Sequence, residues 1–206
     1  MAKAGAISGR DSDDGNMIAI SKMDAEEEIS PIMYAGHRLL GENRVQEAAE
    51  KWPELCDEFD DIAVHLVGQL QSNKAEDAVR LFDTIHSLDR VSLVKALAKA
   101  MDELDRRIPC FIQVNIGEEP QKGGCAIGEL ADLLAAAKNA DVEVLGLMCV
   151  PPAGVNPAPY FALLAKLAQD NGLAGLSMGM SGDFETAIKL GATHVRVGTA
   201  LFGARS

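Results

Sequence analysis

The side chain best placed to do chemistry is a lysine at the end of an apolar run. The segment "NMIAISKMDAEE" (residues 16–27) puts Lys22 directly after strand-like apolar residues and before an acidic stretch that starts a helix. In a partly dry pocket a lysine is disfavoured as an ammonium, so its pKa falls and its amine becomes a nucleophile toward carbonyl groups. The simpler alternative is that Lys22 is the solvated end of a strand.

Two glycine-containing segments near the C-terminus supply groups that suit an oxyanion. "GMSGD" (179–183) contributes glycines and the hydroxyl of Ser181, and "VGTA" (197–200) contributes Gly198 and Thr199. Backbone N–H groups at a strand-to-helix junction carry partial positive charge that complements a phosphate. No P-loop lysine accompanies them, so a phosphate monoester fits better than a nucleoside triphosphate. The competing interpretation is that Ser181 only caps the next helix.

A nucleophilic amine and a phosphate site together indicate a ligand that uses both, which is a phosphorylated aldehyde. Two ligand types meet that description: a sugar phosphate, as in a Schiff-base aldolase, and pyridoxal 5′-phosphate. The residues considered so far leave both open.

The elements that must position these groups alternate along the chain. Stretches with helical periodicity, among them 91–107, 127–140 and 160–172, separate eight short apolar runs. The apolar runs are 17–21, 37–41, 62–68, 81–87, 109–116, 142–150, 173–179 and 194–198. Alternating strands and helices predict a parallel sheet, and eight such units predict an α/β fold of the single (β/α)8 TIM-barrel type. The alternative, an open doubly wound sheet, usually has a GxGxxG turn after its first strand, and "SKMDAEE" has none.

In a (β/α)8 barrel the functional groups lie on the loops that leave the carboxyl ends of the strands. Lys22, Asn43, Ser181 and Thr199 all fall there. We expect one barrel domain over residues 17–206, which binds the ligand, and a short flexible segment over residues 1–16.

The composition narrows the class of protein further. A formal net charge of −12 argues against a nucleic-acid partner, which requires clustered lysine and arginine. The four cysteines have no CxxC spacing and predict reduced, mostly buried thiols, and the four histidines match no metal-binding motif. Because we see no signal peptide and no membrane-length apolar run, we expect a cytoplasmic protein.

Five blocks, in order and with compatible spacing, resemble the YggS/PROSC family of pyridoxal phosphate-binding proteins. The resemblance runs from about residue 17 to the C-terminus. The blocks are "IAISK" (18–22), "AGHRLLGENRVQEAAEK" (35–51), "VHLVGQLQSNK" (64–74), "LSMGMSGDFETAI" (176–188) and "VRVGTALFGAR" (195–205). The resemblance implies a fold-type III barrel like the N-terminal domain of alanine racemase, without the second, β-rich domain.

The resemblance also assigns roles at a pyridoxal phosphate (PLP) site. Lys22 would carry the cofactor as an internal aldimine, and Asn43 would lie near its ring. Arg196 would face the pyridine nitrogen, which would then stay unprotonated because a guanidinium does not give up its proton. The remaining positions implied are Ser181, Gly198 and Thr199 for the phosphate, and Met178 and Met180 as walls of the pocket.

The chain departs from the family in three places. It lacks the usual long amphipathic helix before the first strand, its segment between strands six and seven is shorter, and Met23 and Asp24 replace the usual threonine and proline. None of these removes an implied cofactor contact.

The function implied is a carrier with no dedicated catalysis. Such a protein would bind PLP reversibly, keep the free aldehyde low and deliver it to apo-enzymes, acting as a monomer in PLP homeostasis. The alternatives are a PLP-dependent racemase-like enzyme and the sugar-phosphate aldolase. Racemisation needs acid/base groups on two faces of the substrate carbon. The two tyrosines, Tyr34 and Tyr160, lie in predicted helices and not at strand ends.

Overall fold

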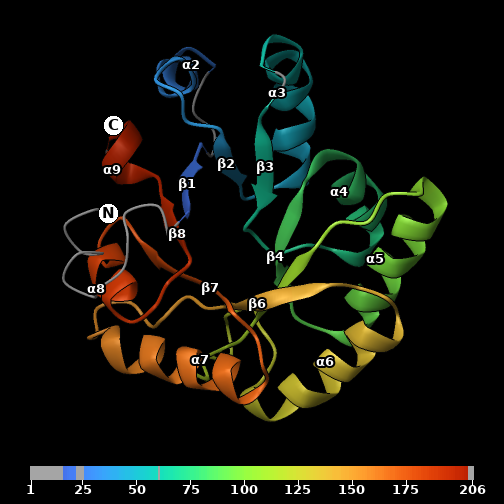
Figure 1. The fold of residues 1–206 in the computed structure, drawn as a ribbon, viewed down its shortest axis with the longest axis vertical. Coiled ribbons are helices and arrows are strands. Elements are labelled where there is room, and N and C mark those ends of the chain that lie inside the picture. The colour runs from blue at the N-terminus through green and yellow to red at the C-terminus, as the bar shows by residue number, and fades with distance from the viewer. Residues whose placement is uncertain (1–15, 22–25, 60, 204–206) are drawn as a thin grey trace.

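Eight parallel strands close into a barrel in a computed structural model, which describes residues 16–21, 26–59 and 61–203. Each strand pairs with its neighbours in chain order, and β1 pairs with β8 to complete the circle (Figure 1). The strands are β1 (Asn16–Ile20), β2 (Leu39–Glu42), β3 (Ala63–Leu66), β4 (Thr84–Leu88), β5 (Cys110–Gln113), β6 (Val144–Met148), β7 (Gly175–Met180) and β8 (His194–Val197). The predicted TIM barrel is therefore confirmed, and the open doubly wound sheet is excluded.

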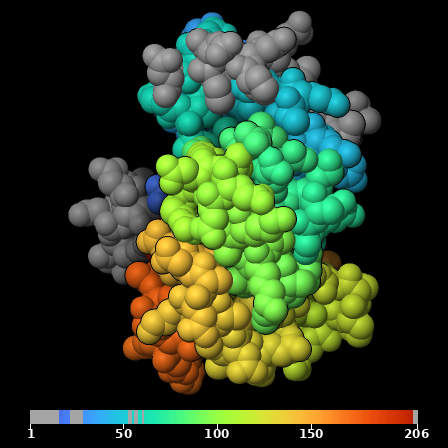
Figure 2. All heavy atoms as spheres, turned by 90° about the vertical axis from the view of Figure 1, so that its right-hand side faces the viewer, coloured from blue at the N-terminus to red at the C-terminus, as the bar shows by residue number. Residues whose placement is uncertain are grey.

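Helices follow the strands and form the outer layer (Figure 1). The α-helices are α2 (Glu26–Tyr34), α3 (Val45–Glu58), α4 (Ala75–Leu81), α5 (Val91–Leu104), α6 (Leu130–Asn139), α7 (Ala158–Asp170), α8 (Phe184–Lys189) and α9 (Thr199–Phe202). Two short 3-10 helices, η1 (Ser72–Lys74) and η2 (Ile127–Glu129), precede α4 and α6. Figure 2 shows the green and yellow segments that carry α4, α5 and α6 forming one continuous face of the molecule.

Helix α5 shows how the sequence sets an element and where it ends. Its residues Leu93, Val94, Leu97 and Met101 are buried, as the helical spacing of apolar residues predicts. The periodicity predicts a helix to residue 107, but α5 ends at Leu104. Asp105 adopts φ 47° and ψ 40°, the left-handed conformation that terminates helices.

The apolar core has two parts. Between barrel and helices, fully buried Trp52, Phe82 and Phe161 belong to one large cluster of apolar side chains. Each such side chain contributes about 1.5–3 kcal/mol by its burial. Inside the barrel, Phe111 stacks on His86 with ring centroids 4.4 Å apart. The barrel is therefore filled and can act as a rigid platform for the loops at its ends.

The cysteines, the length of the helices and the N-terminal segment can be set against the expectations from the sequence. Cys110, Cys125 and Cys149 are free and buried, and burial raises the pKa of each thiol to about 12. None of the helices in the described part of the chain is long and apolar enough to cross a membrane. Residues 1–15 lie outside the described residues, so the flexible N-terminal segment and the missing first helix stay predictions.

Candidate ligand-binding site at the barrel mouth

A cavity of about 430 Å³ opens where the carboxyl ends of several strands meet. It collects residues that are far apart in the sequence but lie at the ends of β1, β2, β3, β6, β7 and β8 or just after them. Its lining residues are Ile20, Asn43, Val67, Val150, Met180, Ser181, Gly182, Arg196, Gly198 and Thr199. Six of the eight residues predicted for the site are among them: Asn43, Met180, Ser181, Arg196, Gly198 and Thr199.

The other two predicted residues are not part of this lining. Lys22 lies outside the described residues, and its role stays a prediction. Met178 is fully buried in the apolar cluster between barrel and helices, whereas Met180 is 40% exposed and lines the cavity. Gly179 lies between them with φ 94°, and the pairing of β7 with β8 shifts register there. The two methionines therefore do not share one side of the strand, as simple alternation would require.

Ser181 lies at the end of the cavity that the segments after β7 and β8 form. Its Oγ accepts hydrogen bonds from the backbone N–H groups of Gly198 and Ala200, each at 3.3 Å. A Cβ added at Gly198 would come within 3.2 Å of the Ile20 carbonyl oxygen, so the close approach of these loops suits glycine. A hydroxyl and converging amides make a cradle for a phosphate oxygen.

The helix that follows β7 has a different cap from the one considered in the sequence. The N-cap residue of α8 is Asp183, and its Oδ1 accepts a hydrogen bond from the Met180 backbone N–H at 2.6 Å. Ser181 instead faces the loop after β8. The interpretation of Ser181 as a mere helix cap is therefore wrong.

Arg196 brings a buried cation to the same cavity. It is 5% exposed, and its guanidinium donates to the Ser177 hydroxyl at 2.7 Å and to the Cys149 carbonyl at 2.8 Å. Among the described residues no carboxylate forms an ion pair with it. Burial lowers the pKa of Arg196 below its usual 12.5, yet a guanidinium remains charged at neutral pH. A guanidinium has five N–H donors, so it retains capacity for an acceptor on a ligand.

Glu42, the middle residue of the "GEN" segment, fixes the strand ends beside the cavity. Its Oε1 accepts hydrogen bonds from Ser21 at 2.6 Å, from Lys51 at 2.9 Å and from the Trp52 indole at 3.1 Å. Burial raises the pKa of Glu42, although the hydrogen bonds and the positive charge of Lys51 oppose that rise. This cluster joins the end of β1 to β2 and α3. The sequence analysis did not identify it, although Glu42 lies next to predicted Asn43.

Three histidines occupy the barrel interior below the cavity, and none was singled out from the sequence. His65 and His86 are buried and 3.0 Å apart, from Nδ1 to Nε2, and His194 lies near both rings. Burial lowers the pKa of His65 to about 3 and that of His194 to about 4, and it brings the pKa of His86 well below 6.5. Because these pKa values lie below neutral pH, the three rings are uncharged hydrogen-bonding groups at pH 7.

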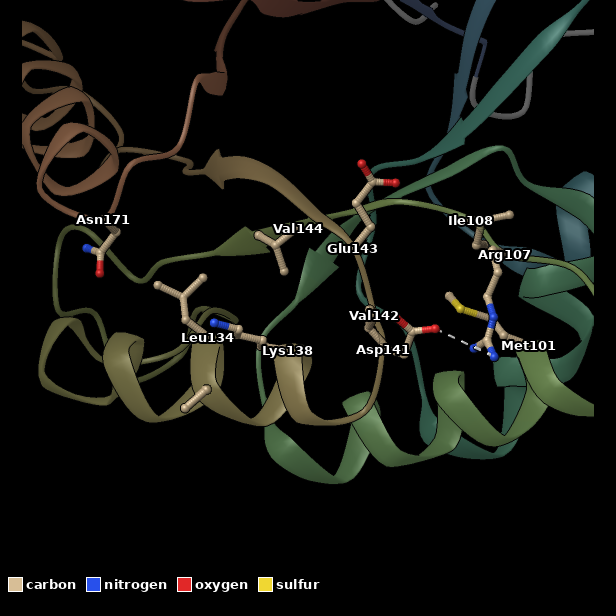
Figure 3. Close-up of a pocket in the computed structure, with 11 residues that line it drawn as sticks. Met101, Arg107, Ile108, Leu134, Lys138, Asp141, Val142, Glu143, Val144 and Asn171 are labelled. Atoms are coloured by element: carbon tan, nitrogen blue, oxygen red, sulfur yellow. Dashed lines mark ion pairs between the residues drawn. The ribbon is translucent and has the colours of Figure 1, made fainter.

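Another cavity, of about 730 Å³, lies on the amino-terminal side of β5 and β6 (Figure 3). It is bordered by α5, α6 and the segments that enter β5 and β6. Two of its charged residues form an ion pair, since Arg107 lies 3.9 Å from Asp141. This is the amino-terminal face of the strands, which in this fold contributes to stability and not to ligand chemistry. The smaller cavity at the mouth is therefore the candidate site.

The comparisons with known proteins agree with this fold. The family model of the alanine racemase N-terminal domain matches residues 12–206. The pyridoxal phosphate homeostasis protein of Pseudomonas aeruginosa is 37% identical over 98% of this chain and 90% of its own length. That of Aquifex aeolicus is 38% identical over 98% of this chain and 92% of its own length. A solved structure of PipY from Synechococcus elongatus PCC7942 with PLP bound has a TM-score of 0.86 and 36% identity, covering 98% of this chain and 99% of PipY.

The closed barrel and the family model over residues 12–206 define the alanine racemase N-terminal-domain class of α/β proteins. The chain belongs to this class and, within it, to the family of pyridoxal phosphate homeostasis proteins.

Proposed function

We propose that this chain binds pyridoxal 5′-phosphate reversibly at the barrel mouth and serves intracellular PLP homeostasis. The observation that carries the proposal is that one cavity holds two kinds of group that suit PLP. These are the Ser181 hydroxyl with its neighbouring amides, and the buried Arg196, which forms no ion pair with a carboxylate among the described residues. Relatives that are 37–38% identical are named for PLP homeostasis, and PipY, at 36% identity, holds PLP. The donor set fits the cofactor, because one end of PLP is a phosphate and its ring offers an acceptor nitrogen.

The residues of the chain divide between the two ends of that ligand. Ser181, Thr199 and the backbone at Gly198 would hold the phosphate, and Asn43 would lie beside the ring. Arg196 would donate to the ring nitrogen and, because it keeps its proton, would leave that nitrogen unprotonated. When bound, PLP supplies an aldehyde that reacts with an amine and a ring that withdraws electrons. Lys22 would provide the amine.

These assignments favour a carrier without dedicated catalysis. An unprotonated ring nitrogen withdraws electrons weakly, which removes much of the advantage that PLP gives to an enzyme. A racemase also needs a second acid/base group at the substrate. Tyr34 is 71% exposed on α2 and donates to Glu58, Tyr160 lies in α7, and neither lines the cavity. We expect a monomer in the cytoplasm that delivers PLP to apo-enzymes.

Covalent trapping tests the proposal directly. The purified chain is incubated with PLP, reduced with borohydride, digested and analysed by mass spectrometry. We expect one modified peptide, carrying the added mass at Lys22, and loss of the visible chromophore in Lys22→Ala. Lys74→Ala, which removes a lysine in η1, is the matched control and should keep the chromophore. An unchanged spectrum in Lys22→Ala would contradict the assignment.

Transfer to an acceptor tests the carrier role. The loaded chain is mixed with an apo form of a PLP-dependent enzyme, and recovery of that enzyme's activity is followed over time. Recovery with matching loss of absorbance from the carrier supports delivery. Exchange of the α-proton of an amino acid by the loaded chain alone would instead support the racemase-like alternative.

A further inference from the structure

A line of buried hydrogen bonds crosses the barrel interior and ends at the arginine of the candidate site. Arg196 on β8 lies 2.7 Å from the Ser177 hydroxyl on β7, and that hydroxyl lies 2.8 Å from His86 Nδ1 on β4. His86 Nε2 is in turn 3.0 Å from His65 Nδ1 on β3. All four side chains are at most 7% exposed. The line therefore joins opposite sides of the barrel away from water.

The direction of each hydrogen bond follows from the arginine. A guanidinium can only donate, so the Ser177 oxygen accepts from Arg196, and its own proton remains to be donated. The other side-chain partner of that hydroxyl is His86 Nδ1, which must then accept. A neutral imidazole that accepts at Nδ1 carries its proton at Nε2, and this proton is donated to His65 Nδ1. The arginine thus sets the tautomers of both histidines.

The reverse arrangement satisfies fewer groups. If His86 donated from Nδ1, the Ser177 oxygen would accept twice, and its hydroxyl proton would have no partner among these contacts. His86 Nε2 would then be an acceptor, and His65 would have to reverse as well. A buried donor without a partner is costly, so the first arrangement is preferred. Burial keeps both rings neutral, because it lowers the pKa of His65 to about 3 and that of His86 well below 6.5.

We propose that His86 is a positioning residue, which acts through Ser177 to hold the guanidinium of Arg196 in the orientation that it presents to an acceptor atom at the barrel mouth. Apart from the Ser177 hydroxyl, the side-chain contact of Arg196 is the Cys149 carbonyl. One bond alone would leave the guanidinium free to rotate about it, whereas two bonds, one to β7 and one to the residue after β6, fix its plane. The proposal rests on the proposed PLP site for the identity of the acceptor, which is the ring nitrogen.

Binding of two matched ligands tests the role of His86. One is PLP and the other is its deaza analogue, in which a C–H replaces the ring nitrogen. In the wild-type chain we expect PLP to bind about tenfold more tightly, since one charge-assisted hydrogen bond is lost in the analogue. In His86→Phe, which keeps an aromatic ring against Phe111 but no nitrogen, we expect the ratio to fall to about twofold or less. Ser177→Ala should give the same loss and serves as the second variant if His86→Phe does not fold.

His194→Gln is the matched control, because His194 is an interior histidine whose hydrogen bonds go to Thr193 and Asn16 and not to Ser177. It should keep the tenfold ratio. Discrimination that persists in both His86→Phe and Ser177→Ala would overturn the positioning role while leaving the PLP site intact. Equal binding of both ligands by the wild type would also overturn it. Binding of neither ligand would instead refute the proposed function.

The hydrogen-bond direction can be checked without any ligand. Nitrogen-15 NMR of the wild-type chain distinguishes a protonated from an unprotonated ring nitrogen in each histidine. We expect the His86 signals to show a proton on Nε2 and none on Nδ1. A proton on Nδ1 of His86 would contradict the inference whatever the chain binds.

Discussion

Lys51 and Glu42 form an ion pair inside the protein, with Lys51 Nζ 2.9 Å from Glu42 Oε1 and side chains that are 13% and 0% exposed. The same carboxylate oxygen accepts from Ser21 and Trp52. The pair therefore holds together the end of β1, the end of β2 and helix α3. In the sequence, Ser21 is followed directly by Lys22, the residue proposed to capture the ligand.

Replacing Lys51 by methionine should destabilise the protein in a pH-dependent way. Removing one partner of a buried pair leaves an uncompensated charge, which costs about 3–5 kcal/mol. The loss should be smaller at pH 5 than at pH 8. Without Lys51 the pKa of Glu42 rises further, so the folded state keeps a proton that the unfolded state releases, and stability falls as the pH rises. Urea unfolding at the two pH values measures this.

Lys74→Met is the control for that experiment. Lys74 pairs with Asp77 at 3.2 Å on the surface of α4, where both partners are more than a third exposed. We expect a change of at most about 0.5 kcal/mol at either pH. An equal loss for Lys51→Met at pH 5 and pH 8 would show that Glu42 is not the residue responsible.

Acidification should unfold the protein by charging the interior histidines. Their pKa values are near 6.5 in the unfolded chain but about 3 for His65 and well below 6.5 for His86 in the folded one. Between those values the unfolded state binds more protons, so the free energy of unfolding falls as the pH falls from 6.5 toward 3. Each ring contributes about 1.4 kcal/mol per pH unit. Measured by urea unfolding, the free energy of unfolding should fall less steeply from pH 7 to pH 5 in His86→Phe than in the wild type. Parallel curves for the two proteins would exclude His86 as a cause of the acid sensitivity.

Gly68→Ala should disturb the site through the backbone of Asn43. An added Cβ would lie 2.0 Å from the Asn43 carbonyl oxygen, which is far closer than atoms can approach, so the loop after β2 must move. We expect a loss of about 1–3 kcal/mol in stability and weaker PLP binding. Gly128→Ala is the control, because nothing lies within 4 Å of its added Cβ, and it should be neutral or slightly stabilising. Urea unfolding and PLP titration of both variants measure these two effects, and equal behaviour of Gly68→Ala and Gly128→Ala would contradict the prediction.

The phosphate cradle should respond to loss of its hydroxyls. In Ser181→Ala the Gly198 and Ala200 amides lose their acceptor, and the ligand loses a donor. We expect PLP affinity to fall about tenfold in Ser181→Ala, and to fall also in Thr199→Ala, with covalent capture retained in both. The affinity for pyridoxal, which has no phosphate, should change little. Ser92→Ala, on the exposed face of α5, is the control. Equal losses for PLP and pyridoxal would place Ser181 away from the phosphate.

Much of the fold follows from local patterns in the sequence. Each of the eight apolar runs overlaps one strand, since short apolar segments between amphipathic stretches are typical of a buried parallel sheet. The ends of the strands are predicted less accurately than their existence. The run 81–87 begins in helix α4 and the loop after it, because Leu81 and Phe82 are apolar for packing against the barrel and not for strand pairing.

The site was predictable where a residue stands at a strand end, and less so inside the barrel. Asn43, Ser181 and Arg196 meet in one cavity because parallel strands all end on the same face. The line from His86 to Ser177 joins residues 91 positions apart, and only the closed barrel brings them together. No local spacing signals such a contact. The family resemblance implies that Met178 is part of the pocket wall. In the structure the backbone at Gly179 departs from regular strand geometry, and Met178 does not line the cavity.

The pairing of β1 with β8 determines whether the sheet has an open edge. Because that pairing, over Asn16–Ala19, closes the circle, every strand has a neighbour on both sides. A closed sheet exposes no row of free amides and carbonyls on which another chain could add a strand. The eight described strands therefore offer no open edge as a template for strand-by-strand aggregation.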